Sequence, residues 1–379
     1  MPQREYFGYN SIIKLKDILK KHNPKNIFLV TGKSSYEKSG AKNIIEQTLK
    51  TYDYIRFFDF KENPKIADIE KGIKLFKKNN CDFVIAVGGG SVLDIAKSVN
   101  ILAANHAKPT EYIKNKKNLT KKGKTLVAIS TTAGSGSEAT RFAVIYINKK
   151  KYSLDNELII PDYAIVDPKF TMNLPKSITA SAGMDALSQA IESYWCIYST
   201  EESKSYAKEA IRLVMKNLAI AANNPTKDSR ESMAKAAHLA GKAINITKTT
   251  ACHSISYPIT SYFNVPHGHA VALTLASFLD YNYNVTKHDV LDKRGAIHVK
   301  QTINEIVKLL GSNNIYEAKV KVTSLMKSVG LKTKLSELGI NTDKDIMLIV
   351  RNGFNPERVK NNPRKLTVEA LNEILNKIR

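Results

Sequence analysis

The sequence is poor in cysteine, poor in acidic residues and free of long apolar runs. Its three cysteines, Cys81, Cys196 and Cys252, lie far apart and form no CxxC pair, which argues against a disulfide framework and a cysteine zinc site. No segment reaches the roughly 18 apolar residues that a membrane span needs. Charges also appear too early for a signal peptide. We therefore expect a soluble, cytoplasmic protein without a membrane partner.

The shortage of acidic residues leaves a net charge of +23, from 58 basic and 35 acidic side chains. Such an excess favours anionic partners in general. Most of it is scattered lysine, as in "KNKKNLTKKGK" at 114–124, which is typical of solvated faces and loops. No zinc finger, RNA-binding strand motif or basic groove with interleaved aromatics accompanies it. The charge therefore favours a small anionic ligand over nucleic acid.

The order of apolar segments predicts two domains in this chain of 379 residues. Continuous apolar runs alternate with helical patterns in the first half, which predicts a doubly wound, mainly parallel, Rossmann-like α/β domain. The expected strands are 26–32, 83–91, 126–132 and 163–168, with an amphipathic helix from Ile66 to Phe76. Strand signals then nearly vanish. A boundary near Lys176 gives an α/β domain at 1–176 and an all-helical domain at 177–379, with a cleft between them.

Two glycine-rich segments follow expected strands. "VGGGSVLDIAK" at 87–97 ends a strand and opens a helix, where glycines and free N–H groups suit a pyrophosphate. It lacks the GxGxxG pattern, so alone it is equally typical of an ordinary turn. "STTAGSGSEAT" at 130–140 follows another strand, and two such loops at neighbouring strand ends define a ligand crevice. The expected nucleotide contacts are Gly88, Gly89, Gly90, Ser91, Asp94, Thr131, Thr132 and Ser135.

The end of the first apolar strand bears on the choice of dinucleotide. A carboxylate there would bind the adenosine ribose and repel a 2′-phosphate. The turn instead holds Gly32, Lys33, Ser34 and Ser35. It therefore favours NADP(H) over NAD(H), unless it is only a polar turn.

The helical half contains polar residues at spacings that suggest a metal site. Asp185 and Gln189 lie one turn apart in "GMDALSQAIESY" at 183–194, so they share one face of an expected buried helix. The later segment "ACHSISYPITSYFNVPHGHA" adds His253, His267 and His269. One carboxylate, one amide oxygen and two imidazoles would suit a divalent Lewis-acid cation. The alternative for each residue alone is a hydrogen-bonded core position.

Taken in order, these motifs resemble the iron-containing (group III) alcohol dehydrogenase family over nearly the whole chain. The resemblance rests on "GGGSVLDIAK", "TTAGSGSEAT", "PDYAIVDP", "GMDALSQAIESY", "CHSISYP" and "VPHGHA". It implies the dehydroquinate synthase-like architecture, a nicotinamide cofactor on the glycine loops, and Fe²⁺ or Zn²⁺ held by Asp185, Gln189, His253 and His267.

The sequence departs from the family pattern at two positions. Gln189 stands where most members have histidine, and an amide oxygen is a harder and usually weaker ligand than imidazole. Tyr257 stands where many have a second histidine near the substrate. The resemblance places His267, His269 and Tyr257 at the reaction centre. Tyr257 can donate a hydrogen bond but is a poor general acid at neutral pH, so we expect the proton to come from His269 or water.

A narrower resemblance is to the phosphonoacetaldehyde reductase branch of this family. It is carried by "YFGYNSI", "FLVTGKSSYEKSGA", "GMDALSQAIESYW", "AGKAINITKTTACHSISYPIT" and "VPHGHAVALTL". A phosphonate dianion needs cationic partners. Arg141, Lys242 and Lys248 lie beside these motifs, and we expect them to bind it, the alternative being surface solvation or helix packing.

The resulting prediction is a metal-dependent NAD(P)H-linked oxidoreductase that reduces phosphonoacetaldehyde to 2-hydroxyethylphosphonate in phosphonate biosynthesis. The alternatives are a general primary-alcohol or diol dehydrogenase of the same family, or a dinucleotide-binding protein without catalysis. We expect a homodimer or higher homo-oligomer that binds no nucleic acid.

Overall fold

The computed structural model describes residues 2–379, the side chain of Glu357 excepted. The chain forms two compact units, of which the first ends at Leu174 and the second begins at Pro175. None of the helices within the described residues combines the length and the apolar character that crossing a membrane requires.

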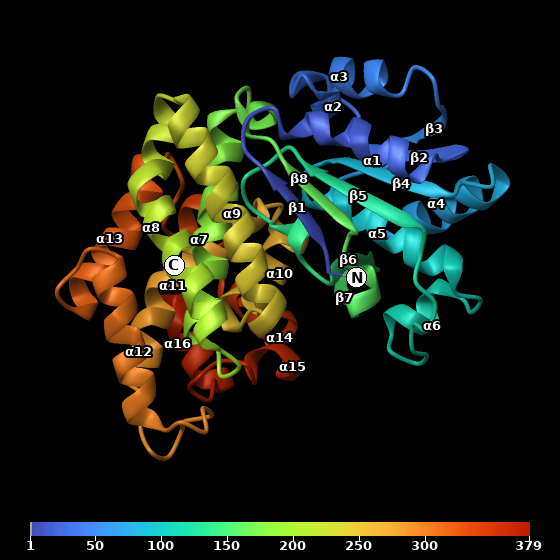
Figure 1. The fold of residues 1–379 in the computed structure, drawn as a ribbon. Helices are drawn as coiled ribbons and strands as arrows, with labels where there is room; N and C mark the ends of the chain where they lie inside the picture. Colours follow the sequence, from blue (N-terminus) through green and yellow to red (C-terminus); the bar gives the residue numbers. More distant parts are fainter. Residues whose placement is uncertain (1) are drawn as a thin grey trace. The chain divides into compact units, whose positions relative to one another are not determined.

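The first unit is built on a six-stranded sheet with the order β1-β8-β5-β4-β2-β3, in which all neighbouring pairs are parallel (Figure 1). Its strands are β1 (Arg4–Phe7), β2 (Asn26–Thr31), β3 (Asp53–Phe57), β4 (Phe83–Gly88), β5 (Thr125–Ser130) and β8 (Tyr163–Val166). The four apolar runs correspond to β2, β4, β5 and β8, which confirms the predicted parallel sheet. The edge strands β1 and β3 were not predicted, because both are short and largely exposed.

Helices cover both faces of this sheet, as its continuous apolar strands require. Ile27 and Leu29 of β2 pack with α1 (Lys14–His22) and α3 (Ala41–Thr48). The alternate residues Phe28 and Val30 pack on the other face with α4 (Ile66–Lys78) and α5 (Gly90–Ala104). The shorter segments are η1 (Ser11–Ile13), α2 (Ser35–Lys38), α6 (Pro109–Ile113), η2 (Ser137–Ala139), η3 (Glu157–Ile159) and η4 (Pro168–Thr171).

An antiparallel hairpin of β6 (Phe142–Ile147) and β7 (Lys150–Asp155) also belongs to the first unit. It was not predicted. The hairpin contacts α5 directly, because the backbone N–H of Val144 donates to the Asp94 carboxylate at 3.1 Å.

The second unit is helical throughout, as predicted. Its elements are α7 (Lys176–Trp195), α8 (Glu201–Asn223), α9 (Lys227–Thr247), α10 (Ala251–Phe263), α11 (His267–Tyr283), α12 (Ala296–Leu309), α13 (Ile315–Ser328), η5 (Ser336–Leu338), α14 (Asp343–Gly353), α15 (Pro356–Val359) and α16 (Val368–Lys377). Helix α7 packs against α8, α9, α11 and α12. Polar side chains on α7 must therefore find partners inside the protein.

Candidate active site

Three of the four predicted metal ligands meet in the second unit. Asp185 comes from α7, His253 from α10 and His267 from the first residue of α11. One ligand atom from each lies within 4.8 Å of the others. The two imidazole rings stand 5.5 Å apart, with an angle of 72° between their planes. A carboxylate and two imidazoles at this separation form a donor set that suits a divalent cation.

The fourth predicted ligand, Gln189, lies beside Asp185. Its amide Nε2 donates to Asp185 Oδ2 at 3.2 Å, and both side chains are buried. The i, i+4 spacing on α7 brings them together, as the sequence indicated. The structure therefore gathers all four predicted residues in one cluster, in which Asp185, Gln189 and His253 are buried and His267 is half-buried.

Close approach of α11 to α7 makes this cluster possible. A Cβ atom on Gly268 would lie 2.0 Å from the carbonyl oxygen of Ser181 and 2.7 Å from the Cβ of Asp185. Any side chain at residue 268 would therefore push α11, and His267 at its start, away from Asp185. Gly268 lies inside the "PHGH" motif, but its contact with α7 joins residues far apart in the chain and was not predicted.

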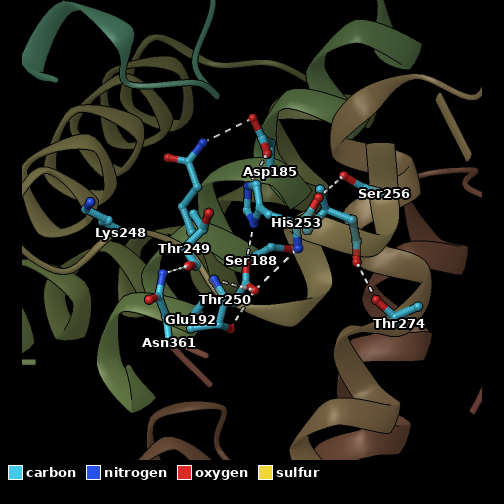
Figure 2. A network of polar contacts seen from close by, with 12 residues as sticks. Asp185, Ser188, Glu192, Lys248, Thr249, Thr250, His253, Ser256, Thr274 and Asn361 are labelled. Carbon is cyan, nitrogen blue, oxygen red and sulfur yellow. Dashed lines mark hydrogen bonds and ion pairs between the residues drawn. The ribbon is translucent and has the colours of Figure 1, made fainter. Parts of the chain in front are cut away.

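A further buried carboxylate contacts the cluster. Glu192 of α7 is fully buried and touches His253 Nδ1, while His253 Nε2 lies 3.4 Å from Asp185 Oδ1. Figure 2 shows the His253 ring between Asp185 and Glu192. Burial alone would lower the pKa of His253, but the two carboxylates outweigh it and raise this pKa to about 10. The site therefore attracts positive charge at the position of this ring.

Two neighbours border His267. Ser256 Oγ lies 3.4 Å from His267 Nδ1 and donates its own proton to the His253 carbonyl oxygen at 2.7 Å. The ring of Tyr257 lies 6.2 Å from the His267 ring, at an interplanar angle of 29°. Tyr257 thus lies next to the metal-ligand candidates, as predicted, and is half-buried.

The structure argues against His269 as the source of the proton. The ring nitrogen Nε2 of His269 donates to the carbonyl oxygen of Lys332 at 2.7 Å, and its backbone N–H donates to Ser181. Burial also lowers its pKa. The two histidines of "HGH" are only two residues apart on α11 and therefore point in different directions. His269 instead connects α11 to the Lys332 backbone and to Ser181 of α7 through hydrogen bonds.

In the first unit, the two glycine-rich loops lie side by side. Gly88 at the end of β4 is paired with Ser130 at the end of β5. A Cβ on Gly89 would lie 3.0 Å from the Thr132 side chain, and one on Gly90 would lie 2.9 Å from Ser135 Oγ. Because Gly90 begins α5, free N–H groups of a helix start adjoin the second loop. Ser91 lies in the same first turn, where its Oγ accepts from the Asn63 backbone.

Asp94 has a different role from the nucleotide contact that we expected. It is buried, and its carboxylate accepts from Ser137 Oγ at 2.8 Å and from Val144 N at 3.1 Å. One turn later, the buried Lys97 ammonium donates to the carbonyl oxygens of Ser137, Thr140 and Phe142. Asp94 and Lys97 therefore bind the second glycine-rich loop and the strand that follows it. The carboxylate of Asp94 contacts protein donors instead of the expected cofactor.

At the end of β2, Gly32 leaves no room for a side chain. A Cβ there would lie 2.0 Å from Ser35 Oγ. The guanidinium of Arg56, on the adjacent strand β3, donates to Thr31 Oγ1 at 2.9 Å and to the Gly32 carbonyl oxygen at 3.2 Å. It also lies over the rings of Tyr36 and Phe58. The cationic side chain of Arg56 therefore lies at the turn where the ribose is predicted to bind. Arg56 was not predicted there, because β3 was not recognised as a strand.

The three predicted substrate cations differ in their surroundings. Arg141 forms ion pairs with Asp155 and Glu157, which compensate its charge and leave it unsuited to the predicted role. Lys242 lies over the Tyr206 ring at 4.9 Å. Lys248 follows the last residue of α9 with a φ of 70°, and lies close in sequence to Thr250, which contacts Glu192 (Figure 2).

Comparison with known proteins gives the same family for both halves of the chain. The family model for iron-containing alcohol dehydrogenases matches residues 2–168, and the model for the C-terminal part of that family matches residues 179–379. The chain is 30% identical over 383 residues to an NAD-dependent methanol dehydrogenase of Bacillus methanolicus, covering 99% of this chain and 98% of the relative.

Two further relatives act on small anionic aldehydes, according to their names. A phosphonoacetaldehyde reductase of Streptomyces viridochromogenes is 32% identical over 303 residues, which covers 78% of this chain and 75% of the relative. The crystal structure of a sulfoacetaldehyde reductase from Bifidobacterium kashiwanohense, in complex with NAD⁺, superimposes with a TM-score of 0.88. It is 30% identical, and the match covers 100% of this chain and 97% of the other.

Proposed function

Because the chain belongs to the iron-containing alcohol dehydrogenase family, we propose that it reduces a small anionic aldehyde to a primary alcohol with NADPH. The best-fitting reaction is conversion of phosphonoacetaldehyde to 2-hydroxyethylphosphonate. The observation that carries the proposal is the convergence of Asp185, His253 and His267 beside Gln189.

Asp185, Gln189, His253 and His267 would hold a divalent cation, Fe²⁺ or Zn²⁺. Bound there, the cation supplies Lewis-acid polarisation of the aldehyde carbonyl. The donor set fits because it combines carboxylate, amide and imidazole groups, of which all but His267 are buried.

Tyr257 is the proposed proton donor to the product alcohol. Its ring lies against that of His267. A phenol hydroxyl group carries one proton that it can donate. Its hydroxyl can therefore donate a hydrogen bond before reduction and release the proton as the alcohol forms.

NADPH is the proposed hydride donor. The N–H groups at the start of α5 and the loop from Thr131 to Ser135 would bind its pyrophosphate. Gly32 presents no carboxylate, and Arg56 offers a guanidinium that suits the 2′-phosphate of NADPH, with Lys33, Ser34 and Ser35 nearby in sequence.

The proposed substrate class follows from two relatives named for aldehydes with a tetrahedral anionic group. Of the three predicted cations, Lys248 is the best candidate for binding the phosphonate, with Lys242 second, because Arg141 is already held by two carboxylates. Lys248→Ala should raise the KM for phosphonoacetaldehyde and leave that for acetaldehyde unchanged. Lys235→Ala is the matched control, since Lys235 forms an exposed ion pair with Glu209.

The second candidate function is that of a general primary-alcohol dehydrogenase. It is favoured by the methanol dehydrogenase relative, which matches over nearly the full length of both chains. Under this alternative, Lys248→Ala affects turnover of simple and phosphonate-bearing aldehydes equally.

The deciding experiment is an NADPH oxidation assay on protein reconstituted with Fe²⁺ or Zn²⁺. The substrates are phosphonoacetaldehyde, sulfoacetaldehyde and acetaldehyde, each also measured with NADH. A higher kcat/KM for phosphonoacetaldehyde supports the proposal, and equal values support the general dehydrogenase. Absence of oxidation with all three, despite nucleotide binding, would identify a non-catalytic dinucleotide-binding protein.

A further inference from the structure

Glu192 is a fully buried carboxylate for which the proposed reaction has no direct use. It lies on α7, seven residues after Asp185 and three after Gln189, so it continues the polar stripe of that helix. Burying a carboxylate is costly unless donors surround it.

The two oxygens of Glu192 have different partners. Oε1 accepts from the backbone N–H and the hydroxyl of Thr250, at 3.1 Å and 2.7 Å, and from the His253 N–H at 3.4 Å. These donors belong to the start of α10, where Thr250 is the N-cap. Oε2 contacts the His253 ring nitrogen Nδ1. One oxygen therefore caps a helix, and the other contacts an imidazole (Figure 2).

We propose that Glu192 is a positioning residue that fixes the tautomer of His253. By accepting the Nδ1 proton, its Oε2 atom leaves the lone pair of Nε2 directed to the side of the ring where Asp185 lies, 3.4 Å away. The inference rests on the proposed metal site and adds to it a residue outside the ligand set. A carboxylate partner also makes the imidazole a stronger ligand.

The ring of the second histidine ligand, His267, lies beside a neutral hydroxyl group. His267 Nδ1 lies 3.4 Å from the neutral hydroxyl of Ser256, and neutral hydrogen bonds are weaker than those to an ionised group. The contact with Glu192 therefore orients His253 more strongly than the contact with Ser256 orients His267. Since Gln189 is expected to bind less strongly than histidine, this chain depends on His253 more heavily.

Glu192→Gln separates the two roles of the carboxylate. The amide oxygen can replace Oε1 at the start of α10, where all partners are donors. The amide N–H₂ group then faces His253 Nδ1 and donates to it, which moves the ring proton to Nε2. The variant keeps the helix cap and loses the ligand lone pair.

Co²⁺ binding to the metal-free protein tests this separation, with affinity measured by chelator competition and geometry by the visible absorption of the ion. Glu192→Gln should weaken Co²⁺ binding about 10- to 100-fold, the usual effect of losing such a partner. Thr250→Val, which removes one cap contact, should lower the melting temperature and change affinity less than about threefold. Glu305→Gln, which alters a carboxylate bound to Tyr194, is the matched control and should leave both unchanged.

The alternative outcomes have separate meanings. The positioning role would be overturned if Glu192→Gln bound Co²⁺ as tightly as the wild-type protein. It would also be overturned if Thr250→Val lost as much Co²⁺ affinity as Glu192→Gln. Neither result would contradict the metal site itself. Failure of the wild-type protein to bind Co²⁺ would overturn the metal site of the proposed function and this inference with it.

A measurement on the unmutated protein covers the case in which Glu192→Gln does not fold. Zn²⁺-loaded protein with ¹⁵N-labelled histidine should show a protonated Nδ1 and a metal-bound Nε2 for His253, identified by the loss of its signals in His253→Asn. A protonated Nε2 would contradict the proposal.

Discussion

The glycine-rich loops of the first unit and the carboxylate–imidazole cluster of the second are built in opposite ways. The loops present backbone N–H groups and depend on small residues, as the close approach of Gly90 to Ser135 illustrates. The cluster presents side chains and depends on buried partners such as Glu192. A backbone site is sensitive to added volume, whereas a side-chain site is sensitive to the identity and protonation of each group.

Metal removal should produce the largest difference between the two regions, because it should abolish catalysis at the cluster and leave nucleotide binding at the loops. We expect chelation to lower aldehyde reduction more than about 1,000-fold, since a Lewis-acid cation contributes several kcal/mol to catalysis. NADPH affinity, measured by fluorescence titration, should stay within about twofold, because the loops use backbone donors. Readdition of Fe²⁺ or Zn²⁺ is the control, and activity that survives full chelation would contradict the assignment of the cluster.

Gly268→Ala tests whether the cluster also depends on added volume. The new methyl group overlaps the Ser181 carbonyl oxygen, and overpacking costs about 1–3 kcal/mol. We expect metal affinity to fall about 5- to 100-fold, measured by Co²⁺ titration. Ala276→Ser adds one atom on a less buried part of α11 and should change little. An unchanged affinity in Gly268→Ala would show that α11 can shift without moving His267.

The pH dependence of metal affinity distinguishes the cluster from the loops. The pKa of His253 is raised to about 10 from 6.5, so the metal-free protein gains stability from this proton below pH 6.5. That contribution is lost as the pH rises through about 10. Because metal and proton compete for Nε2, apparent Co²⁺ affinity should rise by about tenfold per pH unit between pH 7 and 9. An affinity that does not change with pH would disprove this competition.

Arg56→Gln tests the guanidinium group that we assign to nucleotide selection. Loss of a charge-assisted contact to the 2′-phosphate should weaken NADPH binding about tenfold. NADH is the matched control, because it differs from NADPH only by this phosphate. The affinity of the variant for NADH should equal that of the wild-type protein. Equal loss for both nucleotides would mean that Arg56 only supports the Gly32 turn.

Gly90→Ala should have the smallest effect. Its methyl group would meet the Ser135 hydroxyl at 2.9 Å, a contact that a flexible side chain can relieve at about 1 kcal/mol. We expect NADPH affinity to fall about fivefold, with Co²⁺ affinity unchanged. Ala103→Ser, at the other end of α5, is the control. A loss of metal affinity in Gly90→Ala would show that the two regions are not independent.

Much of the fold could be read from local patterns. The apolar runs at β2, β4, β5 and β8 are long enough to reveal a parallel sheet. The short edge strands β1 and β3 and the β6–β7 hairpin were missed, because their partly exposed sequences carry little apolar signal. Missing β3 also meant missing Arg56, which reaches Gly32 only through strand pairing.

Some of the site residues were also predictable from local patterns. Asp185 and Gln189 share a helix face through their spacing alone. Glu192 continues that stripe, so its position in a largely apolar helix is a signal that could have identified it. Asp94 and His269 were assigned to cofactor and proton transfer because they lie within motifs, but their hydrogen bonds to Ser137 and Lys332 can be seen only in the folded chain.

The sequence by itself determined the alternation of strands and helices, the glycine turns and the family, because each depends on residues that are neighbours in the chain. Only the tertiary structure decided that His253 faces Asp185, that Glu192 orients its ring, and that Arg141 is held by two carboxylates. These contacts join residues that are far apart in sequence or arise from the way in which strands and helices pack. Their existence depends on which faces the core buries, and no local pattern specifies that.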